Sequence, residues 1–112
     1  MGGETNMARK LVGLCACTMG LAHTFMAAEA LEKAAKEKGY DVKVETQGSD
    51  GIKNKLTSDD IAQADIIIHS VAITPEGMDR FEGYEIYEVE LRELIKNPKG
   101  VLEEIEEDLG FK

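Results

Sequence analysis

"KLVGLCACTMGLAHTFMAAEALEKAAKEKG", Lys10 to Gly39, is the stretch that decides the fold. Its first part, Lys10–Ala16, is a nearly continuous apolar run, which is typical of a strand buried on both faces of a parallel sheet. From about Ala22 the apolar residues recur every three or four positions, which predicts an amphipathic helix with its apolar stripe toward the sheet. Two lysines precede Gly39, so we expect the helix to end there. The stripe comprises Ala22, Phe25, Met26, Ala30, Leu31 and Ala34.

The remainder of the chain repeats this alternation of strand and helix. Further strands are expected at Asp41–Gln47, Asp65–Ile73 and Tyr84–Glu90, the last of them half-exposed at an edge. Further helices are expected from Thr57 to about Ala64, over Leu91–Ile95 and over Val101–Leu109, with a loop around Gly48, Ser49 and Gly51. Thr57 and Asp60 have the spacing of a capping box. The alternation predicts an α/β three-layer sandwich with a four-stranded, mostly parallel sheet.

Length and composition limit the possible functions. With 112 residues, a single domain over residues 7–112 is expected, and we interpret the polar residues 1–6 as an added leader. The formal net charge of −9 argues against nucleic acid or an anionic membrane as the main partner. No apolar run approaches the roughly 20 residues that span a bilayer. The two cysteines and the absence of a signal peptide indicate a reducing cytoplasm.

The junction between the first strand and the first helix has the residues for phosphoryl chemistry. Cys17 follows the strand directly, and ligands bind beyond the carboxyl ends of the strands in such sheets. Backbone N–H groups and the positive end of the helix dipole would hold a phosphate there. The same groups lower a thiol pKa, so we expect Cys17 to be a reactive thiolate that carries a phosphoryl group, and Cys15 to be a core residue.

Other interpretations of the cysteines remain open at this stage. Cys17 could be an inert core residue like Cys15. A metal site would use Cys15, Cys17 and His23, although structural zinc sites usually have a fourth ligand. The cysteine loop also resembles that of the low-molecular-weight tyrosine phosphatases, which place arginine where His23 stands. A thiol phosphatase is therefore an alternative function.

The sequence "CTMGLAHTFMAAEALEKAAKEKG", Cys17 to Gly39, resembles the fructose-type IIB (EIIB) components of the bacterial phosphoenolpyruvate-dependent sugar phosphotransferase system. Their usual motif is CPTGxAHTFMAAEAL. The resemblance continues through "VKVETQGSDGIKNKLTSDDIAQADIII" to "DRFEGYEIYEV". It implies a sheet of strand order 2-1-3-4 with a phosphate loop after the first strand.

The resemblance also implies a phosphotransferase activity and its partners. A IIA phosphohistidine would phosphorylate Cys17, and the phosphoryl group would pass to fructose or a related sugar bound by the membrane component IIC. The chain would then work in the cytoplasm, at the inner face of the membrane through IIC and without inserting into it. No cofactor and no metal are expected. A phosphorylated IIB-like regulatory module is a further alternative.

The predicted phosphate-binding residues follow Cys17 in the chain. They are Thr18, Met19, Gly20, Leu21, Ala22, His23 and Thr24. Two of them depart from the family motif, since Thr18 replaces proline and Met19 replaces threonine; we therefore describe the substrate as fructose-like.

Five residues outside this loop have weaker predictions. Gln47, Gly48 and Ser49 either frame a docking face or form an ordinary turn. We expect Arg80 to pair with a carboxylate. His69 is expected to be a hydrogen-bonded core histidine rather than a ligand.

Overall fold

The computed structural model describes residues 9–16, 21–48, 51–72 and 75–110, and for residues 21–23 it describes the backbone alone. The strands are β1 (Lys10–Ala16), β2 (Asp41–Gly48), β3 (Gly51–Lys53), β4 (Ile66–Val71) and β5 (Tyr87–Glu88). The α-helices are α1 (Leu21–Glu37), α2 (Ser58–Gln63), α3 (Leu91–Lys96) and α4 (Pro98–Leu109), and η1 (Met78–Phe81) is a 3₁₀ helix.

β1 lies at the centre of one sheet with the strand order β3-β2-β1-β4-β5. It pairs in parallel with β2 and β4, and β5 pairs in parallel with β4. The expected order holds for β2, β1, β4 and β5. The expected count of four strands is wrong, however, because β3 adds a fifth strand outside β2.

β3 replaces part of the loop expected after β2. It pairs antiparallel with β2, with Gly48 opposite Gly51 and Gln47 opposite Ile52. Gly51 has a φ of 103°, which glycine adopts without strain. A strand of three residues is too short for alternation to reveal it, so the two glycines suggested a loop.

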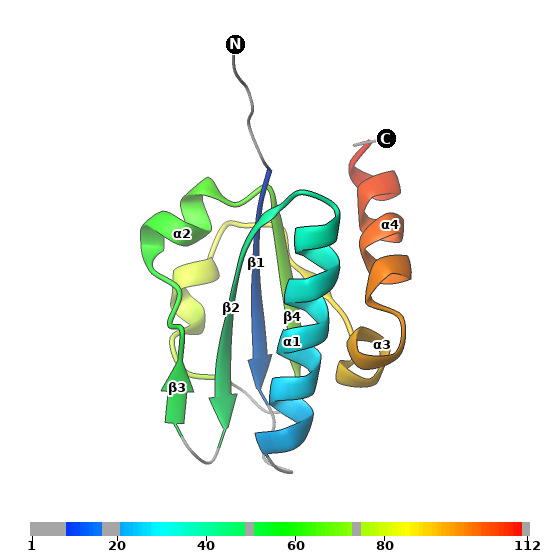
Figure 1. Cartoon of the computed structure of the whole chain (residues 1–112). Helices are drawn as coiled ribbons and strands as arrows, with labels where there is room; N and C mark the ends of the chain where they lie inside the picture. Colours follow the sequence, from blue (N-terminus) through cyan, green and yellow to red (C-terminus); the bar gives the residue numbers. More distant parts are fainter. Residues whose placement is uncertain (1–8, 17–20, 49–50, 73–74, 111–112) are drawn as a thin grey trace.

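Helices cover both faces of the sheet, as expected for a three-layer sandwich (Figure 1). On one face, α1, α3 and α4 enclose an apolar core that includes Leu11, Leu31, Ile68 and Leu102. On the other face, α2 and η1 enclose a smaller apolar cluster. Its buried members are Val12, Leu14, Leu56, Ile61, Ile67 and Phe81.

The first turns of α1 depart from the predicted apolar stripe. Phe25 and Met26 are 38% and 50% exposed, whereas Ala27 and Ala28 face the sheet. Small residues let the helix approach β1 closely, and a Cβ at Gly13 would lie only 2.8 Å from Leu31 Cδ2. Close packing therefore turns the alanines inward and leaves two large apolar side chains in solvent.

Local signals set the boundaries of the shorter helices. Thr57 Oγ1 accepts from the Asp60 amide and Asp60 Oδ2 accepts from the Thr57 amide, so the predicted capping box is confirmed. The last helix begins before the expected Val101, because Asn97 is the N-cap of α4 and Pro98 lies in its first turn. Within the described ranges, no helix has the length and apolar character to cross a membrane.

Candidate functional site

The carboxyl ends of three parallel strands meet at one edge of the sheet. β1 ends at Ala16, β2 at Gly48 and β4 at Val71, and α1 begins at Leu21 at the same edge (Figure 1). The predicted nucleophile Cys17 and its neighbours Thr18, Met19 and Gly20 lie outside the described residues. In the described part of the chain, Ala16, which precedes Cys17, ends the central strand, and Leu21, which follows Gly20, begins the helix.

The N-terminus of α1 provides a positive electrostatic end at this edge. α1 has 17 residues and no acidic residue in its first turn. Its first amides have no partner within the helix, and the helix dipole adds roughly half a positive charge there. The helical backbone of Leu21, Ala22 and His23 belongs to this turn, while their side chains lie outside the description. The turn is therefore suited to an anion.

Thr24 is the one predicted phosphate-binding residue whose side chain the structure describes. It is 2% exposed, and its hydroxyl has no hydrogen-bond partner among the described residues. Buried hydroxyls in proteins nearly always have a partner. In the first turn of α1, the Thr24 hydroxyl is therefore free to bond a group outside the described residues, such as a bound anion.

The structure assigns Cys15 to the core, as expected. Its side chain is fully buried, and its thiol is free. Burial, with a smaller contribution from Glu32, raises the pKa of Cys15 to about 12. The full burial of this thiol among apolar side chains agrees with a packing role for Cys15.

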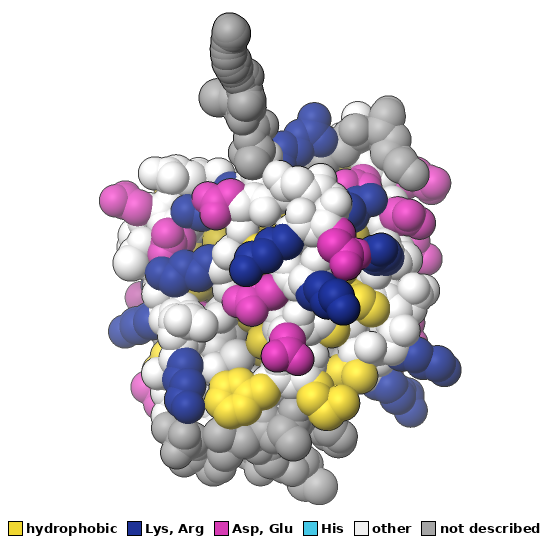
Figure 2. All heavy atoms as spheres, in the orientation of Figure 1, with side chains coloured by type: hydrophobic (Ala, Val, Ile, Leu, Met, Phe, Trp, Pro, Cys, Tyr) yellow, Lys and Arg dark blue, Asp and Glu magenta, His cyan; other side chains and the backbone are white. Residues whose placement is uncertain are grey.

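An apolar rim adjoins this edge of the sheet. Its described members are Phe25 and Met26 in the first turns of α1 and Ile52 on β3, all of them exposed. Figure 2 shows hydrophobic side chains gathered along the bottom of the molecule, where α1 begins. Lys53 Nζ lies 5.0 Å from the centre of the Phe25 ring. A partner that reached the site would contact this rim.

A buried carboxylate lies on the face of the sheet that α2 and η1 cover, near the carboxyl ends of the strands. Glu45 on β2 is fully buried, and Arg80 Nη1 lies 2.8 Å from its Oε1. Arg80 also donates to the backbone carbonyls of Gly77 (2.6 Å) and Leu56 (2.7 Å). The expected pairing of Arg80 with a carboxylate is confirmed, and its guanidinium is fully engaged by this pair and these carbonyls.

Hydrogen bonds keep Glu45 ionised despite its burial. Burial would raise the pKa of its carboxyl, but the hydrogen bonds that it accepts, chiefly from Arg80, outweigh burial and lower this pKa. The Leu56 amide donates to Oε1 at 2.8 Å and Gln47 Nε2 donates to Oε2 at 2.7 Å. Sequence reasoning missed this carboxylate, because an acidic residue in an alternating strand ordinarily faces solvent.

Gln47 connects this carboxylate to the segment after β4. Its Oε1 accepts from the Glu76 amide at 2.8 Å, and its Nε2 donates to the Glu76 carbonyl at 3.0 Å. The side chain is only 6% exposed. Gln47 is therefore a buried bridge near the end of β2, Gly48 is the last residue of that strand, and Ser49 lies outside the described residues.

His69 lies in the core, as expected, but it lacks the expected hydrogen bond at one nitrogen. It is 2% exposed, and its ring packs edge-on against Phe81 with centroids 4.3 Å apart. Nε2 has no hydrogen-bond partner within the part of the chain that the structure describes. Burial lowers the pKa of His69, so the ring is neutral at pH 7.

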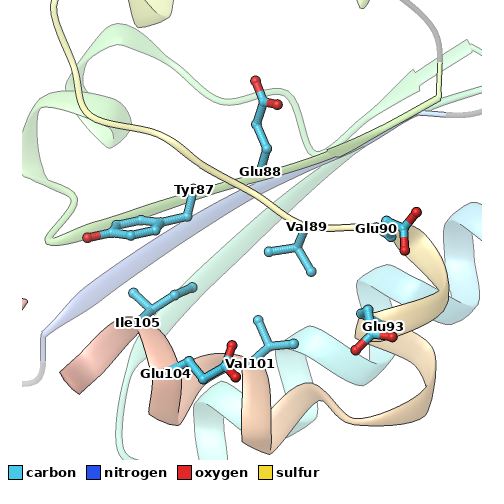
Figure 3. A pocket seen from close by; sticks show the side chains of 8 residues that line it. All are labelled: Tyr87, Glu88, Val89, Glu90, Glu93, Val101, Glu104 and Ile105. Atoms are coloured by element: carbon cyan, nitrogen blue, oxygen red, sulfur yellow. The ribbon is translucent and has the colours of Figure 1, made fainter. Parts of the chain in front are cut away.

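A hollow separate from the candidate site lies beside β5. β4 stands between β5 and the central strand β1. The hollow has a volume of about 390 Å³. Val89, Val101 and Ile105 face one another across it, and carboxylates occupy its rim (Figure 3). Its lining contains four glutamates and no cationic side chain, so it does not suit a phosphoryl group.

Comparisons with known proteins agree on one family. The family described as "PTS system, Lactose/Cellobiose specific IIB subunit" matches residues 12–104. The chain is 64% identical over 101 residues to "PTS system fructose-like EIIB component 1" of Escherichia coli (strain K12), covering 90% of this chain and 94% of that protein.

Solved structures support the same assignment. The solution structure of an enzyme IIB subunit from Escherichia coli K12 has a TM-score of 0.87 and 62% identity, covering 93% of this chain and 96% of that one. A crystal structure of a domain from the fructose-specific IIABC component of Borrelia burgdorferi has a TM-score of 0.82 and 41% identity, covering 88% and 93%. The chain therefore belongs to the fructose-like EIIB family of the sugar phosphotransferase system.

Proposed function

We propose that this chain carries a phosphoryl group on Cys17, receiving it from a phosphohistidine of a IIA component and passing it to a fructose-like sugar bound by IIC. Membership of the EIIB family supports a phosphotransfer role together with IIA and IIC components in general. The observation that carries the finer proposal is the position of Cys17. It follows the carboxyl end of the central parallel strand and stands four residues before the first residue of α1.

In the first step the Cys17 thiolate attacks phosphorus in line with the leaving histidine nitrogen. The S–P bond forms as the P–N bond breaks, and the electron pair of that bond returns to the imidazole of the donor. Amides of Thr18–Gly20 and of the first turn of α1, with the side chains of His23 and Thr24, would bind the phosphoryl oxygens. The Thr24 hydroxyl, which is buried and has no hydrogen-bond partner among the described residues, supports this role.

In the second step a hydroxyl oxygen of the sugar attacks the same phosphorus. The O–P bond forms, the S–P bond breaks, and Cys17 leaves as a thiolate ready for the next cycle. The hydroxyl proton passes to a base at the IIC-bound sugar or to water. A thiolate stabilised by the helix N-terminus is a good leaving group, so the same feature favours both directions of transfer.

The arginines argue against the alternative of a thiol phosphatase. That class holds phosphate with an arginine in the loop, where this chain has His23. Arg80 is engaged by Glu45, Arg92 lies on α3 with an 81% exposed side chain, and Arg9 precedes β1 at the opposite end of the sheet. The candidate site therefore lacks the arginine fork that hydrolysis of a tightly held phosphate requires.

Docking is expected on the edge that contains Cys17. Both IIA and IIC must bring a reacting atom to this cysteine, so both would contact the apolar rim of Phe25, Met26 and Ile52 in turn. Work at the cytoplasmic side of the membrane, through IIC, follows from this partnership.

The test is the intact mass after incubation with phosphoenolpyruvate, the general phosphotransferase proteins and a fructose-type IIA. We expect one added phosphoryl group in the wild type and none in Cys17→Ser. Cys15→Ala is the matched control, because it removes the other thiol from the core without touching the loop; it should be phosphorylated like the wild type. Absence of phosphorylation with several competent IIA proteins would refute the proposal.

Two further measurements separate the alternatives. A phosphatase would release p-nitrophenol from its phosphate ester without any partner protein, and we expect no such release. A regulatory module would be phosphorylated on Cys17 but would not support sugar phosphorylation by membranes that contain the cognate IIC. Formation of a sugar phosphate that depends on Cys17 distinguishes the carrier from both.

A further inference from the structure

We propose that Gln47 is a positioning residue for Cys17: together with the buried Glu45–Arg80 pair, it fixes the end of β1 from which the phosphoryl-carrying loop departs. This inference rests on the proposed phosphoryl transfer at Cys17. It assigns a role in that reaction to side chains that lie on β2 and η1, outside the cysteine loop.

Two segments flank Ala16, the residue just before Cys17 in the chain. On one side, the Ala72 amide donates to the Ala16 carbonyl at 2.8 Å and so extends the pairing with β4. On the other side, Ala16 is the register partner of Gln47 on β2. The last residue of β1 is therefore held by β2 on one flank and by the end of β4 on the other.

Gln47 then connects the two flanks. Its amide makes two hydrogen bonds with the backbone of Glu76, of 2.8 and 3.0 Å, in the manner of an added strand pair. Ala72 and Glu76 are only four residues apart in the sequence. Ala72 bonds to Ala16, and Glu76 bonds to Gln47, which lies opposite Ala16 on β2.

The buried ion pair makes this bridge rigid. Gln47 Nε2 also donates to Glu45 Oε2, which leaves the amide no freedom to flip. Arg80 holds the same carboxylate and the carbonyls of Glu76 and Gly77. Every donor and acceptor of the Gln47 amide thus has a defined partner, and a fully satisfied buried network fixes geometry.

Rigidity at this point matters because in-line attack requires a well-placed sulfur. A displacement of about 1 Å of a reacting group can reduce the rate by about two orders of magnitude. In the proposed site, a looser end of β1 would also weaken the stabilisation of the thiolate by the N-terminus of α1, which would raise the pKa of Cys17. Two consequences follow for a variant without the bridge: slower transfer in the bound complex and a higher thiol pKa.

The experiment compares Gln47→Met with Tyr40→Phe. Methionine fills the space of glutamine but makes none of its hydrogen bonds. Tyr40→Phe removes a buried hydrogen bond to Glu106 at the amino end of β2, the opposite end of the strand, and serves as the stability control. Single-turnover transfer from phosphorylated IIA is measured over a range of donor concentrations, alongside thermal midpoints.

We expect Gln47→Met to lower the transfer rate at saturating donor at least tenfold, with the half-saturating donor concentration changed less than threefold. Tyr40→Phe should stay within twofold of the wild type in both parameters. A purely structural role of Gln47 would lower the thermal midpoint and leave the saturated rate unchanged; that result overturns the inference. A rise confined to the half-saturating concentration also overturns it, because it indicates a docking contact.

The second readout does not depend on IIA. Alkylation of Cys17 by iodoacetamide, followed against pH, reports its thiol pKa. The midpoint should move to higher pH in Gln47→Met and stay in place in Tyr40→Phe. If the wild type is not phosphorylated, the proposed function fails, and this profile alone decides the positioning role. If Gln47→Met does not fold, Gln47→Asn, which keeps the amide but shortens its reach, is compared in the same way.

Discussion

The two faces of the sheet are stabilised by different chemistry. Aliphatic side chains of α1, α3 and α4 fill the face that includes Leu31 and Leu102. The face beneath α2 and η1 has a smaller apolar cluster and a buried carboxylate paired with a guanidinium. The first face provides most of the apolar burial that drives folding. The second holds together three segments that are far apart in the sequence, β2, the residues before α2 and the residues around η1.

This difference indicates a division of labour between stability and precision. Apolar packing tolerates small shifts, because the hydrophobic effect has no direction. Hydrogen bonds of the kind that Glu45, Gln47 and Arg80 make depend strongly on distance and angle. The directional network lies at the end of the sheet where Cys17 must be placed. Three sets of substitutions test this contrast, in order of decreasing effect.

The largest effect is expected where one charge of the buried pair is left alone. Arg80→Met should lower the free energy of unfolding by about 3–5 kcal/mol, because the Glu45 carboxylate remains buried without its cation. Adding Glu45→Gln should recover at least about 1 kcal/mol, since a neutral amide still accepts from the Leu56 amide and leaves no unpaired charge. Urea unfolding of the wild type, both single variants and the double variant measures the coupling.

A substitution in the apolar core under α1, α3 and α4 is the control for these four proteins. Leu31→Ala should cost about 2–5 kcal/mol through the cavity that it leaves, whether or not the ion pair is present. Additive effects of Arg80→Met and Glu45→Gln would contradict the proposed division, because they would show that the pair does not act as a unit.

An intermediate effect is expected at Gly13, where α1 approaches β1. Gly13→Ala should cost about 1–3 kcal/mol, because its Cβ would lie 2.8 Å from Leu31 Cδ2 and 3.4 Å from Val44 Cγ2. Leu31→Val in the same chain should recover part of this loss by removing the atom nearest to the new methyl group. Thermal or urea unfolding gives both values. If Gly13→Ala is as stable as the wild type, the close approach does not constrain the helix.

The smallest effect is a pH dependence that arises on the η1 face. The pKa of His69 is lowered by burial, so between its folded value and about 6.5 the unfolded chain binds a proton that the folded chain does not. Stability from this residue is therefore complete above pH 7 and decreases as the pH falls, by at most about 1.4 kcal/mol per pH unit.

His69→Asn provides the comparison, with unfolding free energies measured from pH 7.5 to 5.5. The wild type should lose more stability over this range than the variant. The pKa of Glu45 is lowered, so its own pH-dependent contribution to stability changes only at more acidic pH and is the same in the wild type and in His69→Asn. Parallel pH profiles would show that His69 does not titrate with folding.

Local signals made much of this fold predictable from the sequence. The apolar run ending at Ala16, the end of α1 just before Gly39 and the capping box of Thr57 and Asp60 each depend on neighbours within a few residues. Cys15 was correctly assigned to the core because it lies inside a strand buried on both faces.

Features decided by tertiary packing were not predictable. The apolar period of α1 placed Phe25 and Met26 toward the sheet, but the close fit of Gly13, Ala27 and Ala28 turned them outward. The partner of Arg80 is 35 residues away in the sequence, so no local pattern identifies Glu45 as buried. These departures lie at the edge that contains Cys17, where we expect function to override local preference.

The two outermost strands of the sheet, β3 and β5, have a consequence for self-association. β3 has three residues, all exposed and one of them a lysine, and β5 has two residues. A long, flat and apolar edge strand can template the addition of another chain, whereas short, charged edges offer few unpaired backbone groups. Exposed apolar side chains such as those of Phe25, Met26 and Ile52 favour self-association at high concentration. Brief outer strands restrict this self-association to side-chain contacts, which form and break without converting the chains into a continuous intermolecular sheet.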